Sequence, residues 1–67
     1  MKDNLYRVAV HNPKGRLERY RMMRLMSGQL HVTGAMVTLT KDSTPFSPRV
    51  YRVLGKDSEG VPMVQVR

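Results

Sequence analysis

The sequence contains no cysteine and no tryptophan, only five acidic residues, and no long apolar run. Without cysteine, the chain has neither a disulfide bond nor a thiolate ligand for a metal ion. The longest stretch without a charged residue, residues 25–40, includes several polar side chains, whereas a membrane-spanning helix needs about 20 mostly apolar residues. Asp3 and Arg7 interrupt the N-terminal stretch that a signal peptide would keep apolar. We therefore expect a soluble, cytoplasmic protein.

Because acidic residues are scarce, the chain is strongly basic. Twelve Lys and Arg residues, eight of them Arg, stand against five Asp and Glu residues, which gives a net charge of +7. Residues 1–24 hold seven basic and two acidic side chains and therefore carry +5 of this charge. A positive field of this size favours binding to a polyanion or to an acidic protein surface.

Length and turn signals predict one small β domain spanning residues 1–67. A 67-residue chain is near the size at which a single core is marginally stable. Clusters of Gly, Pro, Asn, Asp and Ser separate short runs rich in Val, Leu, Met, Thr and Tyr, which is typical of sandwiches and barrels. We predict an all-β fold of about five strands with at most one short helix. The turn clusters are HNPKG (11–15), SGQ (27–29), TG (33–34), STPFSP (43–48) and KDSEG (56–60).

The clearest strands flank the first and last of these clusters. Residues 5–11, LYRVAVH, alternate with Tyr6, Val8 and Val10 on one face, and residues 49–55 and 61–67 show a similar alternation. Each flanking turn has the Gly-containing length that suits a hairpin. Residues 29–40, QLHVTGAMVTLT, read as a long strand in which a bulge or two-residue turn at Gly34 changes the phase.

The segment RLERYRMMRL, residues 16–25, fits neither period cleanly. We predict a strand because a hairpin turn precedes it, with a short helix over residues 17–26 as the alternative. A bulge near residues 22–23 would let both methionines face the core. In this interpretation the arginines face a partner, while Leu17 and the methionines help to close the core.

Nothing in the sequence indicates catalysis. His11 and His31 are isolated, no Glu-x-x-His spacing supports a metal site, and the serines lack a nucleophile-elbow context. We expect a protein that is not an enzyme and that binds no cofactor or metal ion.

The basic residues are the best candidates for a binding site. Arginine offers a planar fork for phosphate or carboxylate and stacks on aromatic rings, and aromatic side chains can stack on bases. Phe46, between two prolines, is either a contact residue or a core plug. The alternative is that these basic side chains form no binding site and simply lie on a solvated face. The predicted binding residues are Lys14, Arg16, Arg19, Tyr20, Arg21, Arg24, Phe46, Arg49, Tyr51 and Arg52.

From Gln29 onward the sequence GAMVTLTKDSTPFSPRVYRVLGKDSEGVPMVQV resembles small SH3-like β-barrels, the class that includes KOW and Tudor-like modules. The shared features are a Gly-led strand, an irregular loop with an aromatic residue, and a hairpin with a tight polar turn. The resemblance covers about half of the chain and implies a five-stranded barrel that binds nucleic acid, peptides or a larger machine. The spaced glycines of a KOW motif are missing, so no functional position of that family is carried over.

These observations favour a small binding module that contacts nucleic acid or a nucleic-acid-processing machine. The alternative is a protein–protein regulator that docks on an acidic host protein, for example a transcription component, because the small basic chain also resembles phage accessory regulators. A structural or assembly subunit is the third possibility.

Overall fold

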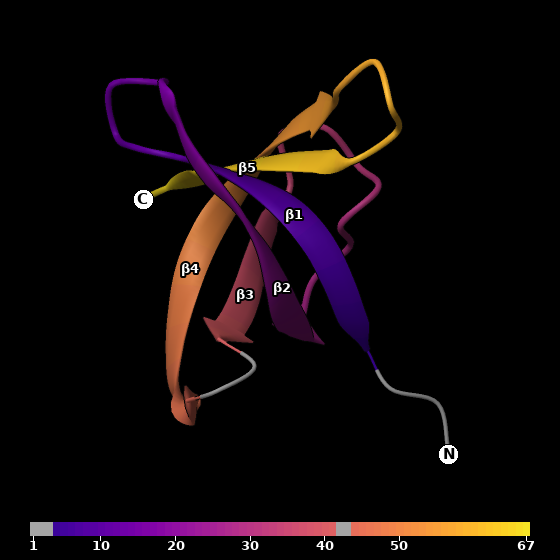
Figure 1. Cartoon of the computed structure of the whole chain (residues 1–67). Helices are drawn as coiled ribbons and strands as arrows, with labels where there is room; N and C mark the ends of the chain where they lie inside the picture. The colour runs from indigo at the N-terminus through magenta and orange to yellow at the C-terminus, as the bar shows by residue number, and fades with distance from the viewer. Residues whose placement is uncertain (1–3, 42–43) are drawn as a thin grey trace.

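In the computed structural model, the chain folds into a closed barrel of five β-strands (Figure 1). The structure describes residues 4–41 and 44–67, and for residues 44–47 it describes the backbone alone. No described residue is helical, so the all-β prediction is confirmed and the helix alternative for residues 17–26 is wrong. The described part of the chain accordingly offers no helix that would cross a membrane. The strands are β1 (Leu5–His11), β2 (Leu17–Ser27), β3 (Met36–Lys41), β4 (Thr44–Lys56) and β5 (Pro62–Val66).

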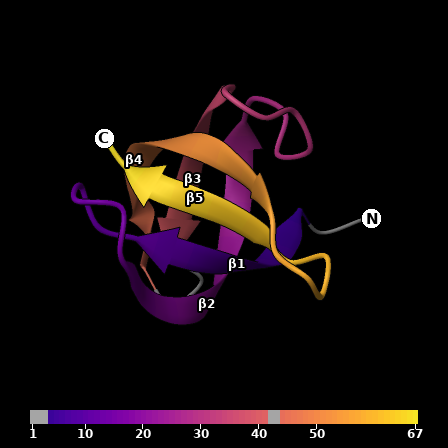
Figure 2. The same ribbon diagram turned by 90° about the horizontal axis from the view of Figure 1, so that it is seen from above.

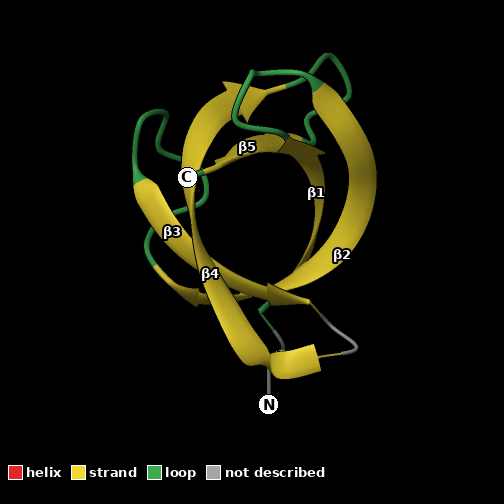
Figure 3. Ribbon diagram, turned by 90° about the vertical axis from the view of Figure 1, so that its left-hand side faces the viewer, coloured by secondary structure: helices red, strands yellow, loops and turns green. Residues whose placement is uncertain are grey.

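Each strand pairs antiparallel with the next one along the chain, and β1 and β5 close the barrel as a parallel pair. The parallel closure follows from the odd number of strands, because the first and last strands of such a meander run in the same direction. The view from above shows β5 beside β1 (Figure 2), and the view from the side shows the strands as a ring (Figure 3). This architecture is compatible with an SH3-like barrel.

The turns β1–β2 and β4–β5 share one hydrogen-bonding design. Asn12 Oδ1 accepts from the backbone N–H groups of Lys14 and Arg16, at 2.9 and 3.0 Å, and Asp57 Oδ1 accepts from those of Glu59 and Val61, both at 2.9 Å. A glycine with positive φ ends each turn, at residues 15 and 60. Type I turns followed by a left-handed residue join strands in this way. The two hairpins predicted from HNPKG and KDSEG are confirmed.

The core lies inside the barrel and receives side chains from all five strands. The inward face predicted for the first and last hairpins is confirmed, because Val8, Val10, Tyr51, Val53 and Val64 are all buried, although Ala9 on the opposite face of β1 is buried too. Partly buried apolar side chains, Tyr6 and Val66 among them, pack around these residues. The buried residues that form this hydrophobic cluster are Val8, Val10, Met23, Leu30, Val37, Leu39, Tyr51, Val53 and Val64.

Strand β2 departs from the prediction in how it uses its apolar residues. Met23 is 1% exposed, but Met22 is 44% exposed, so the predicted bulge that turns both methionines inward is wrong. The β1–β2 register runs without a shift from Leu5 to Val10, and strict alternation therefore sends Met22 outward. Leu17, at 49% exposed, does not help to close the core either. Met26 is also exposed.

Residues 28–35 form a loop rather than the first half of a strand, because β3 begins only at Met36. Leu30 was predicted on a strand face, but it is 1% exposed and projects from this loop into the core. The loop leaves β2 at Gly28, which has φ +92° and where a Cβ would lie 2.5 Å from the Met36 carbonyl oxygen. The backbone N–H of Gly34 then donates to the Val53 carbonyl at 2.8 Å and fixes the loop to β4.

Candidate functional site

The register between β1 and β2 decides which arginines face the inside of the barrel. Directly paired residues of two strands point to the same side of a sheet. Arg21 is paired with the buried Val8, and Arg19 is paired with the buried Val10. Both arginines therefore extend from the inner face of β2, towards one end of the barrel.

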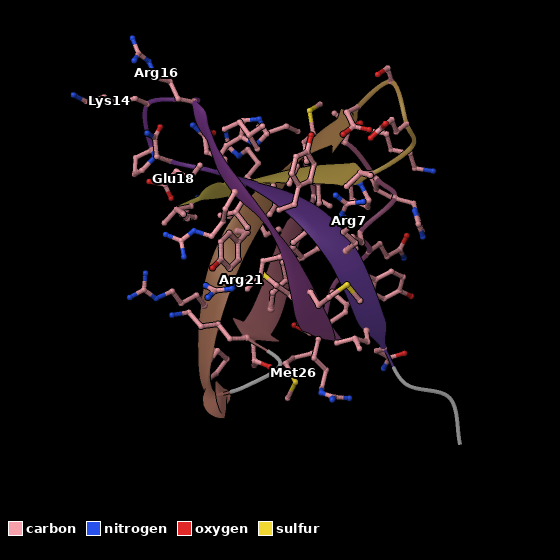
Figure 4. All side chains as sticks on the ribbon, viewed as in Figure 1. Arg7, Lys14, Arg16, Glu18, Arg21 and Met26 are labelled. Atoms are coloured by element: carbon pink, nitrogen blue, oxygen red, sulfur yellow. The ribbon has the colours of Figure 1, made fainter. Side chains whose placement is uncertain are left out.

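Arg19 and Arg21 meet basic residues of two other strands around a hollow of about 190 Å³. Lys41 comes from the end of β3, and Arg49 comes from the part of β4 that pairs with Leu39. Figure 4 shows Arg21 and Glu18 on the side of β2 that faces β4, whereas Arg7 is labelled on the other side of β2, over β1. We call this hollow the open-end hollow; its lining residues are Val10, Glu18, Arg19, Arg21, Met23, Lys41, Arg49, Tyr51 and Val66.

The hollow has basic walls and an apolar floor. Four of its lining residues are cationic, and Glu18 is the one carboxylate among them. No carboxylate that the structure describes forms an ion pair with Arg19, Arg21 or Arg49. Val10, Met23 and Tyr51 belong to the buried core and therefore form the floor. The excess of positive charge in such a site attracts anionic groups.

The structure brings together only some of the residues predicted as one site. Lys14 and Arg16 lie exposed at the tip of the β1–β2 hairpin, at the same end of the barrel but outside the lining of the hollow (Figure 4). Arg52 is exposed on β4, where its register partners are Met36 and Gln65. The backbone of Phe46 belongs to β4, but its side chain lies outside the described part, so the choice between contact residue and plug stays open.

The aromatic residues differ from the prediction. Tyr51 is 5% exposed, so it cannot offer a ring face for stacking and instead contributes to the floor of the hollow. Tyr20 is 43% exposed and lies on the outer face of β2, where the Arg7 guanidinium carbon is 4.8 Å from its ring centroid. Arg24, paired with Leu5, also belongs to this outer face and not to the hollow.

Sequence reasoning missed two polar residues of the hollow. Lys41 lies in a segment with no net charge and was not grouped with the arginines, yet the pairing of β3 with β2 places it opposite Met23. Glu18 was assigned no role from the sequence. No local signal groups Lys41 with the arginines, because only the pairing of β3 with β2 brings it to the hollow.

Both histidines have structural contacts. His11 Nδ1 donates to the Ala9 carbonyl oxygen at 3.1 Å, and the His31 ring meets the edge of Tyr6 with centroids 6.2 Å apart. The described residues contain no group of three His, Cys, Asp or Glu side chains that could hold a metal ion. The expectation that the protein is not an enzyme stays a prediction.

Comparison with known proteins gives no relative: no family model, no curated protein and no solved structure matches the chain.

Proposed function

We propose that the protein is a small non-enzymatic binding module that contacts nucleic acid through the open-end hollow. The observation that supports this proposal is the convergence of Arg19, Arg21, Lys41 and Arg49, from three strands, around one concave site. Cations so arranged neutralise successive phosphates of a backbone that passes over the site. The barrel architecture agrees with the implied SH3-like class, in which KOW and Tudor-like modules are binding domains.

The charge distribution supports a polyanion as the ligand. The net charge of +7 steers polyanions towards the protein, and concave basic sites concentrate the field. Lys14 and Arg16 extend the basic surface beyond the hollow along the β1–β2 hairpin. The hairpin is held in place because Gln65 Nε2 of β5 donates to the Pro13 carbonyl oxygen at 3.1 Å.

A salt titration tests this function. If about four phosphates are neutralised, log affinity for DNA or RNA falls against log salt with a slope of about −3 to −4. We expect the double variant R19Q/R21Q to flatten that slope by about one to two units. It should leave the melting temperature nearly unchanged because Arg19 is exposed and Arg21 is only half-buried.

The matched control is R52Q/K56Q, which removes the same charge from exposed positions of β4 outside the hollow. A control that weakens binding as strongly as R19Q/R21Q would show that only net charge matters. Absence of salt-dependent binding to both DNA and RNA would overturn the proposed function.

A second candidate, a regulator that docks on an acidic protein, is favoured by the outer face of β2. Tyr20, Met22 and Met26 are 43%, 44% and 56% exposed along this face, and Arg7 lies over the Tyr20 ring. Methionine-rich surfaces adapt to different partners. In this case R19Q/R21Q leaves partner binding intact, whereas M22S/M26S abolishes it. An assembly subunit, the third possibility, predicts a stable oligomer in sedimentation equilibrium.

A further inference from the structure

The open-end hollow offers more kinds of chemistry than a phosphate alone can use. Arg19, Arg21, Lys41 and Arg49 suit phosphate oxygens, but Glu18 in the same lining repels them. A carboxylate is an acceptor and needs a ligand that donates hydrogen bonds. Val66, which is half-buried, adds a small apolar surface to the lining that suits a ligand with an apolar part. A bare phosphate diester has neither a donor nor such a surface.

Strand pairing adds further acceptors beside the hollow. β2 pairs with β3 only from Met23 onward, so within the described residues no strand covers the β3-side edge of residues 17–22. β4 pairs with β5 only from Tyr51 onward, which leaves the corresponding edge at Arg49 and Val50 uncovered as well. Uncovered strand edges present peptide N–H and C=O groups. The carbonyl groups again require a donor, which phosphate lacks.

We infer that the open-end hollow receives an unpaired nucleobase, so that the ligand class is single-stranded nucleic acid; this inference rests on the proposed function. A base supplies the donors on its edge and a ring that lies against Val66, while its flanking phosphates lie against the four cations. The arginines can also stack on the ring. A duplex fits poorly because its base edges are paired and its rings are stacked on one another.

Glu18 gives the hollow a preference among bases. Carboxylates accept hydrogen bonds from the exocyclic amino group of cytosine, whereas thymine and uracil present a carbonyl oxygen at that position. When a carbonyl oxygen faces the Glu18 carboxylate, both groups are hydrogen-bond acceptors and no hydrogen bond forms between them. We therefore expect cytosine-containing strands to bind more tightly than thymine- or uracil-containing strands.

The experiment compares labelled strands of about ten nucleotides, a length within the range of small single-strand binding domains. The probes are oligo-dC, oligo-dT, their RNA counterparts, a duplex of mixed sequence, and a strand of abasic nucleotides with the same number of phosphates. We expect oligo-dC to bind about tenfold more tightly than the duplex or the abasic strand, because base contacts are lost in both. Oligo-dC should also bind more tightly than oligo-dT.

A pair of variants tests the part played by Glu18. E18Q removes the carboxylate and should lower the affinity ratio of oligo-dC to oligo-dT towards one. The control E59Q removes the same charge from an exposed position of the β4–β5 turn and should leave that ratio unchanged. Because a ratio is measured, the general gain in affinity that follows from losing a negative charge cancels.

The outcomes separate the two proposals. Equal affinity for oligo-dC, the abasic strand and the duplex, with salt dependence intact, would overturn the base-binding inference and leave the proposed function standing. A ratio that E18Q and E59Q change alike would overturn the assignment of Glu18. No salt-dependent binding of any probe would overturn the proposed function itself.

Discussion

The two ends of the barrel are built from the same strands but are filled in opposite ways. At one end the β2–β3 loop places Leu30 in the core and sets His31 against Tyr6. At the other end no loop of the described residues covers the interior, and Arg19, Arg21 and Arg49 surround the open-end hollow. Apolar closure of both ends would bury more surface and stabilise the fold further. At the charged end, the fold therefore forgoes apolar burial that would add stability.

The largest expected effect is a loss of stability at the filled end. Leu30 is 1% exposed, and L30A removes a fully buried side chain and leaves a cavity, so we expect a loss of about 2–5 kcal/mol in the free energy of unfolding. Chemical denaturation measures the loss. If the alanine variant does not fold, L30V should still show a loss of about 1 kcal/mol. A loss below about 0.5 kcal/mol in both variants would mean that Leu30 does not fill this end.

A smaller effect of opposite sign is expected near the open end. Thr40, next to Lys41, is fully buried, and its Oγ1 finds no hydrogen-bond partner among the described residues. Burying an unpaired hydroxyl costs about 1–3 kcal/mol, and valine has nearly the same shape. We expect T40V to raise the free energy of unfolding by about 1 kcal/mol and the melting temperature by roughly 4–8 °C. A melting temperature that falls would indicate that the hydroxyl is paired in solution.

The smallest expected change in the free energy of unfolding comes from L17A, which makes the same Leu→Ala substitution at an exposed position. Leu17 is 49% exposed where β2 begins. Because no cavity forms at an exposed site, L17A should change the free energy of unfolding by less than about 1 kcal/mol. The two Leu→Ala variants compare the ends directly by denaturation, and equal losses would show that the ends are filled alike.

The sequence predicted the strands where local chemistry determines them. The Asn12 and Asp57 turns make their own hydrogen bonds, so HNPKG and KDSEG were sufficient to place both hairpins. Val8 and Val10 share one face of residues 5–11, and Val53 shares a face with Tyr51, so their burial was also predictable. The register of β2 was not predictable from the sequence, because the two faces of this strand carry similar mixtures of Arg and Met.

The remaining errors come from contacts between distant residues. Leu30 and Val32 have the composition of a strand, but Gly28 ends β2 and tertiary packing brings Leu30 into the core from a loop. Propensity cannot predict such an override. The candidate site required the same long-range information, since Lys41 and Arg49 join Arg19 and Arg21 only after the barrel closes. A sequence count of charge therefore found the arginines of the first half and missed Lys41.

The parallel contact between β1 and β5 determines how this barrel forms and opens. Every other strand pair joins neighbours in the chain and closes short loops, whereas Ala9 to His11 must meet Met63 to Gln65 across almost the whole sequence. Loop-closure entropy places such a step late in folding. Only three residue pairs and the Gln65 hydrogen bonds to the β1–β2 turn hold this contact. Separating β1 from β5 is therefore the opening of the barrel with the lowest free energy, and it leaves the four antiparallel strand pairs intact. The amide protons between β1 and β5 exchange with solvent through this opening.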